Sequence, residues 1–351
     1  LIYTSSLTMS LFLNVLILLK VIDLSSGQLP PSPPPFSWDT IPLFIHTMNR
    51  SGALNETSAK YLARFPLATI EKDQGGDEKY EEDKIIGALK QIRSYSASTR
   101  TIFYLNTVIN FPQYKLSLNF TGANEKYLLH DDKTGELVYF GNCIHNAPNY
   151  TIFDPSYNET RELWVNTVKY AMTKYPGAVD GIFGDRGATT ASVFDKCATL
   201  STQHQTEWTN GHTLMMQEAM KMIYNYDKDR GVIITNGVDV NTVNGRMFEN
   251  FVTSNLPVLM NENGIRISEV HSDKCTFFST KYNQTLAGYL IGASKYDYYM
   301  CTQGWTLQTG WDIIDENPDF KQALGEPISN ATIKNGIYYR EFKQGVKVWL
   351  D

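Results

Sequence analysis

The feature that most constrains the fold is an alternation of short apolar runs with amphipathic segments along most of the 351 residues. The runs are almost continuously apolar, which is typical of strands buried on both faces of a parallel sheet. Eight strands are predicted in this way: residues 42–49, 67–72, 101–107, 181–187, 231–237, 245–250, 265–272 and 296–302.

Three helices are predicted between these strands, over residues 81–96, 158–175 and 212–226. Each carries apolar side chains at helical spacing, and the methionines of the third are expected in the core. Alternating strands and helices with eight strands predict an α/β fold, a (β/α)8 TIM barrel. A doubly wound sheet is the alternative. The long link between strands 3 and 4 predicts an extra inserted β-hairpin over residues 126–140.

The ends of the chain suggest how it is processed. Residues 1–27 are interpreted as upstream sequence and a signal peptide, because an apolar stretch ends near the small residues Ser25 and Gly27. A membrane anchor is the alternative, but the stretch is short for a bilayer, so no stable insertion is expected after signal removal. Residues 28–37 indicate a Pro-rich linker, and 38–351 a single barrel domain, truncated at its C-terminus if the last strand-like segment continues.

Modification signals favour a secreted, extracellular glycoprotein. Glycosylation acceptors of the N-x-S/T type follow the predicted signal at Asn49, Asn55, Asn119, Asn149, Asn158, Asn283 and Asn330. Four cysteines allow up to two disulfides in three connectivities: Cys143, Cys197, Cys275 and Cys301. Their spacing is not that of a zinc site, so we expect no metal and no other cofactor.

Charge and missing motifs exclude several classes of function. The formal net charge is −6, and no run of Lys and Arg exists to neutralise phosphates, so a nucleic-acid partner is not expected. The glycines form no phosphate-binding pattern, and no GxSxG nucleophile elbow is present.

The predicted strand ends are polar, and in a barrel they form the face that carries the active site. Such side chains suit a hydroxyl-rich ligand, and an aromatic ring can stack on a sugar. The predicted substrate-binding residues are His46, Glu71, Asn106, Asn236, His271 and Trp305.

Two aspartates flank the strand GIFG, and they cannot be a catalytic pair. Asp180 and Asp185 are five residues apart, about 16 Å along a strand, whereas glycosidase carboxylates lie about 5–10 Å apart. Asp180 is therefore interpreted as scaffold, and Asp185 as a catalytic carboxylate whose partner is Glu249 or, less favoured, Glu71. A structural ion pair of Asp185 with Arg186 is the alternative.

Four stretches carry a resemblance to a known family: FDPSYNETRELWVNTVKYAM, VDGIFGDRG, GRMFENF and ALGEPISNATIKNGIYYREFKQGVKVWLD. Together they resemble the glycosyl-hydrolase-like TIM-barrel family fifteen, a relative of endo-α-1,4-polygalactosaminidase-type barrels. The resemblance implies a barrel acting on glycosidic bonds, with Asp185 and Glu249 as its carboxylates. It also matches Asp154 to an aspartate before a helix, for which a capping role is favoured.

The leading hypothesis is a secreted glycoside hydrolase that cleaves O-glycosidic bonds of a polysaccharide or glycan with two carboxylates. The alternative is a catalytically inactive barrel glycoprotein with a carbohydrate-binding or structural extracellular role.

Overall fold

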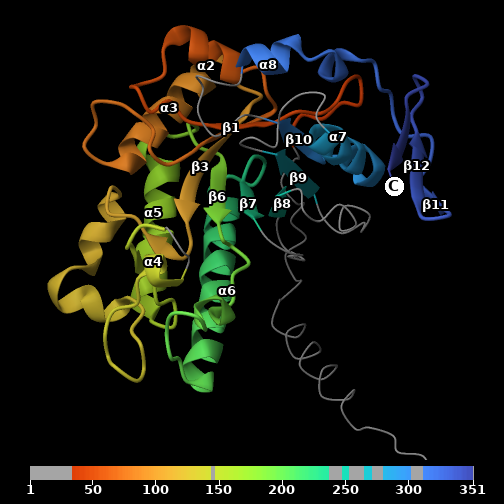
Figure 1. Ribbon diagram of the computed structural model, residues 1–351. Coiled ribbons are helices and arrows are strands. Elements are labelled where there is room, and N and C mark those ends of the chain that lie inside the picture. The colour runs from red at the N-terminus through yellow and green to blue at the C-terminus, as the bar shows by residue number, and fades with distance from the viewer. Residues whose placement is uncertain are drawn as a thin grey trace, which may run out of the picture. The chain divides into compact units, whose positions relative to one another are not determined.

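In the computed structural model, the eight predicted runs form the strands of one parallel sheet (Figure 1). In chain order they are β1 (Ile45–Thr47), β2 (Leu67–Ile70), β3 (Arg100–Asn106), β6 (Gly181–Asp185), β7 (Val232–Asn236), β8 (Met247–Val252), β9 (Ile265–Val270) and β10 (Tyr298–Cys301). The structure describes residues 34–143, 147–236, 247–252, 265–270, 280–301 and 311–350, with β8 and β9 as backbone only. All of these belong to one unit, Pro31–Asp351.

The strand order in the sheet follows the chain, and every neighbouring pair is parallel. This confirms the α/β fold with a parallel sheet. It differs from a doubly wound sheet, whose strand order reverses at a switch point.

The segment before β1 pairs with the last strand of the sheet. Phe44 N donates to Tyr299 O at 3.1 Å, and Tyr299 N donates to Pro42 O at 2.8 Å. A parallel bridge joins Leu43 and Tyr299 at the same place. The two ends of the strand order are therefore linked through this segment.

The larger helices lie between the strands in sequence: α2 (Glu56–Leu62), α3 (Glu81–Tyr95), α5 (Asn158–Lys174), α6 (Thr202–Tyr226), α7 (Thr280–Gly292) and α8 (Trp311–Glu316). Helix α6 starts ten residues before the predicted start at 212. Ser201 is its N-cap and accepts a hydrogen bond from His204 N, but the polar first turns show too little apolar periodicity to be recognised. No helix within the described ranges is long and apolar enough to cross a membrane.

The link between β3 and β6 holds a small two-stranded antiparallel sheet, β4 (Ile109–Asn110) with β5 (Thr151–Ile152), and the short helix α4 (Phe140–Cys143). The hairpin predicted over 126–140 is not seen as two strands. A single antiparallel bridge joins His130 and Leu137, because the backbone on either side pairs with the β5 segment instead.

A disulfide between Cys143 and Cys197 ties this insertion to the segment that precedes α6. It joins two cysteines 54 residues apart. Of the three connectivities that four cysteines allow, the structure therefore has the one that pairs Cys143 with Cys197. Cys275 lies outside the described residues.

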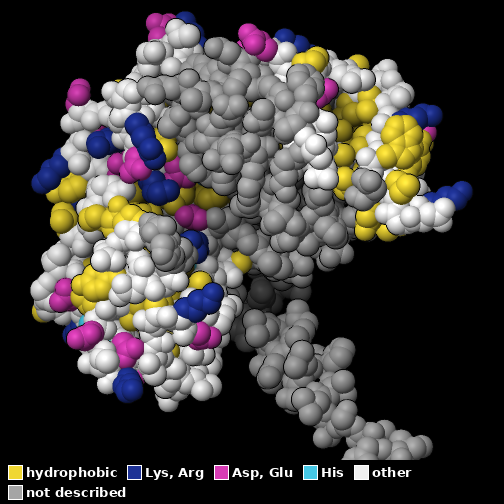
Figure 2. Space-filling view, in the orientation of Figure 1, with side chains coloured by type: hydrophobic (Ala, Val, Ile, Leu, Met, Phe, Trp, Pro, Cys, Tyr) yellow, Lys and Arg dark blue, Asp and Glu magenta, His cyan; other side chains and the backbone are white. Residues whose placement is uncertain are grey.

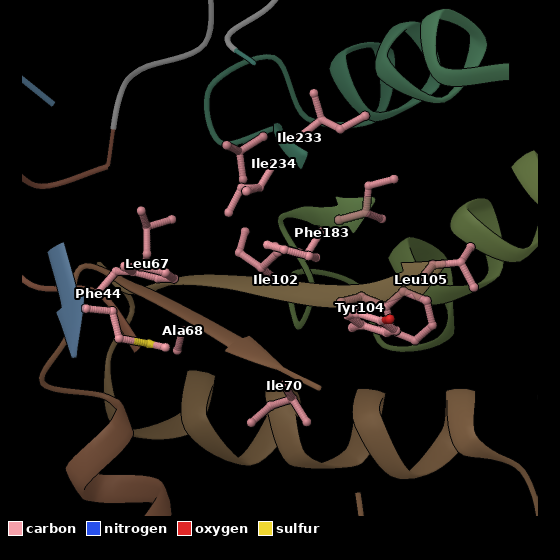
Figure 3. Packing of buried hydrophobic residues seen from close by; sticks show 14 of the residues in the cluster. Phe44, Leu67, Ala68, Ile70, Ile102, Tyr104, Leu105, Phe183, Ile233 and Ile234 are labelled. Atoms are coloured by element: carbon pink, nitrogen blue, oxygen red, sulfur yellow. The ribbon is translucent and has the colours of Figure 1, made fainter. Parts of the chain in front are cut away.

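The core is built from side chains of the strands and of the helices that cover them (Figure 3). Alternation along β3 places Ile102 and Tyr104 on one face and Leu105 on the other. The rings of Tyr104 and Phe183 stack with centroids 5.9 Å apart. Each such buried aliphatic or aromatic side chain contributes roughly 1.5–3 kcal/mol to the free energy of unfolding.

A three-stranded antiparallel sheet follows the parallel one: β11 (Thr332–Lys334), β12 (Ile337–Glu341) and β13 (Lys347–Leu350). Its inner face is fixed to α7 by Arg340, whose guanidinium donates to the carbonyls of Leu290 and Ala293 at the end of that helix. Apolar side chains are visible on its surface (Figure 2), and Trp349 is 59% exposed.

Candidate active site

Asp185 is the last residue of β6, and Asn106 is the last residue of the neighbouring strand β3. Asn106 Nδ2 donates to Asp185 Oδ2 at 2.6 Å. The amide cannot be turned round, because its Oδ1 accepts hydrogen bonds from the backbone N–H groups of Val108 and Ile109 at 2.9 and 2.6 Å. The side-chain NH2 group of Asn106 therefore faces Asp185 as a hydrogen-bond donor.

Tyr104 provides a second donor to the same carboxylate oxygen. Its hydroxyl lies 2.5 Å from Asp185 Oδ2, and the side chain is buried. Burial, together with the charges of Asp185 and Glu71, raises the pKa of Tyr104 well above its usual range, so the hydroxyl keeps its proton. An oxygen that accepts two hydrogen bonds is not the one that carries an acid proton.

The backbone of Asp185 is held from the opposite side. Thr107 donates to Asp185 O from both its N–H and its hydroxyl, each at 2.9 Å. His212 Nε2 lies 2.8 Å from that hydroxyl, whose proton is already used, so the imidazole donates. Burial lowers the pKa of His212 to about 4, and the ring is neutral at pH 7.

Glu71 follows β2 and is buried, with 3% of its side chain exposed. His46 Nε2 lies 3.0 Å from one of its oxygens, and Lys72 Nζ lies 2.9 Å from the other. Burial alone would raise the pKa of Glu71, but Lys72 and His46 outweigh it and the pKa is lowered. Glu71 is thus an enclosed, ionised carboxylate.

The second proposed carboxylate lies on β8. Glu249 is in register with Thr235 of β7, which is in register with Gly184 of β6. The backbone of Glu249 is therefore two strands from that of Asp185 and one residue lower along the sheet. Two inter-strand steps span roughly 10 Å.

The structure describes the other predicted site residues to different extents. Asn106 binds Asp185, whereas His46 binds Glu71. Asn236 ends β7 in register with Asn250. His271 and Trp305 lie outside the described residues.

Asp180 lies just before the first residue of β6 and has a different environment. It is 1% exposed, accepts from Thr101 N at 2.8 Å, and binds the guanidinium groups of Arg93 and Arg230. This environment agrees with the scaffold role predicted for it.

Asp154 also serves the scaffold. It accepts from Ser156 N at 3.1 Å, and its other oxygen lies 2.9 Å from His204 Nε2 in α6. The residue that caps α5 is Tyr157 rather than Asp154. The predicted capping role is therefore replaced by a turn and an ion pair.

Four contributing residues were not predicted: Lys72, Tyr104, Thr107 and His212. A signal existed for Tyr104, because it lies two residues before Asn106 and so on the same face of β3. His212 lies on a helix, and only the tertiary fold brings it to Thr107. Across the described ranges, no cluster of His, Cys, Asp and Glu could hold a metal ion.

Comparisons with known proteins bear on the family and the fold of the chain. The sequence model of a family described as hypothetical glycosyl hydrolase family 15 matches residues 93–346. No curated protein sequence matches the chain.

Among solved structures, a GH31 family sulfoquinovosidase from E. rectale superposes with a TM-score of 0.52 at 12% identity. The match covers 83% of this chain and 47% of the sulfoquinovosidase, so the chain spans about half the length of that enzyme. Ega3 of Aspergillus fumigatus, solved with galactosamine, gives a TM-score of 0.42 at 12% identity, covering 74% of this chain and 89% of Ega3. At such identities the likeness to the sulfoquinovosidase concerns the fold alone.

Proposed function

Because the chain belongs to the hypothetical glycosyl hydrolase family 15, we propose that it is a glycoside hydrolase that uses Asp185 and Glu249 to cleave O-glycosidic bonds of a polysaccharide or glycan. The observation that carries this proposal is the carboxylate of Asp185. It lies at the carboxyl end of a parallel strand and accepts two hydrogen bonds on one oxygen, from Tyr104 and Asn106.

The proposed architecture is a closed (β/α)8 barrel. Its support is the sequential strand order and the pairing of the segment before β1 with Tyr299 of β10. In such a barrel the carboxyl ends of the strands form one face, where active sites lie.

In the proposed mechanism Asp185 is the ionised carboxylate and Glu249 is the acid. The two donors on Asp185 Oδ2 fix the orientation of the carboxylate, which in this mechanism acts on the anomeric carbon directly or through a water molecule. Glu249 then protonates the leaving glycosidic oxygen. The backbones of β6 and β8 lie roughly 10 Å apart, but Glu249 is in register with Gly184 rather than with Asp185. The proposal therefore requires the regular strand alternation to end before one of the two carboxylates, so that both reach the same bond.

Secretion with N-glycosylation is part of the proposal. Six of the seven acceptor asparagines are exposed, and only Asn49 is partly buried. The disulfide between Cys143 and Cys197 is typical of an oxidising compartment.

The test is release of new reducing ends from amylose, galactan and polygalacturonate by the wild type and by Asp185→Asn, Glu249→Gln and Glu269→Gln. Glu269 lies on the neighbouring strand β9, in register with Val252, and is the matched acidic control. We expect the first two variants to lose at least about 100-fold in rate and the control to keep its activity. Full activity of Glu249→Gln with loss in Glu269→Gln would contradict the assignment of the acid. Binding without cleavage by the wild type would favour an inactive carbohydrate-binding barrel.

A further inference from the structure

We propose that Lys72 is a substrate-binding residue of this site, and that its ammonium donates a hydrogen bond to a hydroxyl of the sugar bound against Asp185. The proposal rests on the proposed glycosidase function and adds a specific recognition residue to it.

The first argument is the difference in exposure within the ion pair of Lys72 and Glu71. Lys72 Nζ lies 2.9 Å from Glu71 Oε1. Its side chain is 27% exposed, whereas that of Glu71 is 3% exposed. Of the two charges, the cation is therefore the one that a ligand can reach, and Glu71 acts as a positioning residue behind it.

The second argument is that the ammonium is held in place before any ligand arrives. Glu71 Oε1 accepts from both the backbone N–H and the Nζ of Lys72, each at 2.9 Å. His46 holds the other oxygen of Glu71, and the His46 ring packs against Phe183 with centroids 4.6 Å apart. A side chain fixed in this way loses little conformational entropy on binding.

The third argument links Lys72 to the reacting carboxylate. Lys72 Nζ lies 4.8 Å from the centroid of the Tyr104 ring and 5.5 Å from that of Phe111. The hydroxyl of the same Tyr104 ring binds Asp185. One rigid aromatic side chain therefore sets the spacing between the ammonium and the carboxylate.

The charges around Lys72 keep it protonated. Burial alone would lower its pKa, but the negative charges of Glu71, Asp185 and Asp73 outweigh it and the pKa is raised. An ammonium has three N–H donors, and within the described residues Glu71 Oε1 accepts one of them. The carboxylates of Glu71 and Asp185 outnumber the one ammonium, so a neutral hydroxyl fits this position better than an anionic group.

The experiment compares Lys72→Met and Lys72→Arg with the matched control Lys79→Met. Lys79 lies in the same loop, is exposed, and contacts the Tyr80 ring much as Lys72 contacts Tyr104. Steady-state kinetics on amylose, galactan and polygalacturonate give kcat and KM, and calorimetry in an Asp185→Asn background gives Kd for oligosaccharides of the same three polymers. Thermal unfolding checks that each variant is folded.

We expect Lys72→Met to raise KM and Kd for the preferred neutral sugar by about 10- to 100-fold. Lys72→Arg should recover part of that loss, and Lys79→Met should not differ from the wild type. Glu71→Gln should raise KM less than Lys72→Met, because it only loosens the ammonium.

Unchanged KM and Kd in Lys72→Met would overturn the role of Lys72 while leaving the proposed glycosidase intact. A loss confined to polygalacturonate would overturn the neutral hydroxyl as the ligand. If the wild type cleaves none of the three, the proposed function fails, and the calorimetry still decides whether Lys72 binds sugar. Absence of both cleavage and binding would overturn both proposals.

Discussion

Asn106 and Asp185 end two neighbouring parallel strands at the same register, and the amide of one donates to the carboxylate of the other at 2.6 Å. Adjacent residues in parallel strands share a face, so the sheet itself brings this pair together. The carboxylate orientation then depends on side chains in the layer below, above all Tyr104.

Tyr104→Phe tests that dependence. The substitution keeps the buried ring but removes the hydroxyl that lies 2.5 Å from Asp185 Oδ2. We expect kcat to fall by about 10- to 100-fold with little change in KM, since a hydrogen bond to a charged group contributes about 1.5–3 kcal/mol. Steady-state kinetics on the cleaved polysaccharide check this, with thermal unfolding as the control for folding. A change in KM alone would show that Tyr104 serves binding rather than Asp185.

Asp180, just before β6, and Asp185, its last residue, should respond in opposite ways to the same substitution. Asp180→Asn removes the buried negative charge that pairs with the guanidinium groups of Arg93 and Arg230. Because both cations then lack their counter-charge, the free energy of unfolding should fall by about 3–5 kcal/mol. Asp185→Asn should abolish hydrolysis and leave the free energy of unfolding within about 1 kcal/mol of the wild type. Urea denaturation and a reducing-end assay on both variants measure the contrast. Equal destabilisation by the two would mean that Asp185 is structural.

The strands could be predicted because each is a buried apolar run bounded by polar residues, and all eight were found where the runs occur. Strand ends such as Asn106 and Asp185 followed from the same rule, because parallel strands end on one side of the sheet. The start of α6 was missed because residues 202–211 are polar and form a helix only with a cap at Ser201.

The remaining contacts of the site depend on tertiary structure. Lys72 acquires its place from the Tyr104 ring, 32 positions further along the chain, and no local pattern reports that contact. The turn sequence predicts a hairpin over 126–140, but the residues on either side of the turn pair with the segment around β5. Pairing with a segment further along the chain therefore replaces the local pairing that the turn predicts.

The disulfide between Cys143 and Cys197 should make a large contribution to stability. It closes a loop between cysteines 54 residues apart, and restricting the unfolded chain in this way contributes at most about 4 kcal/mol. Replacing both cysteines by alanine should therefore lower the midpoint of urea denaturation. A reductant should lower the midpoint of the wild type and leave that of the double variant unchanged. An equal effect of the reductant on both would place the redox-sensitive contribution elsewhere in the chain.

His204 should make stability depend on pH on the alkaline side of neutrality. Its imidazole lies between two carboxylates, 2.6 Å from Asp132 and 2.9 Å from Asp154. The hydrogen bond to Asp154, together with that to Asp132 and against burial, raises the pKa of His204 from 6.5 to about 9. Since the folded pKa lies above the unfolded one, the stabilisation is fully present below pH 6.5 and is lost as the pH rises through 9.

His204→Gln keeps a hydrogen-bonding side chain but cannot carry the charge. We expect the wild type to lose about 1–3 kcal/mol of unfolding free energy between pH 6 and pH 10, and the variant to lose distinctly less over the same interval. Urea denaturation at four pH values measures both curves. His130→Gln is the matched control, because the His130 ring contacts the backbone carbonyl of Leu128 at 2.8 Å and lies in the same insertion as Asp132. Parallel curves for the wild type and His204→Gln would show that the ion pairs of His204 do not stabilise the fold.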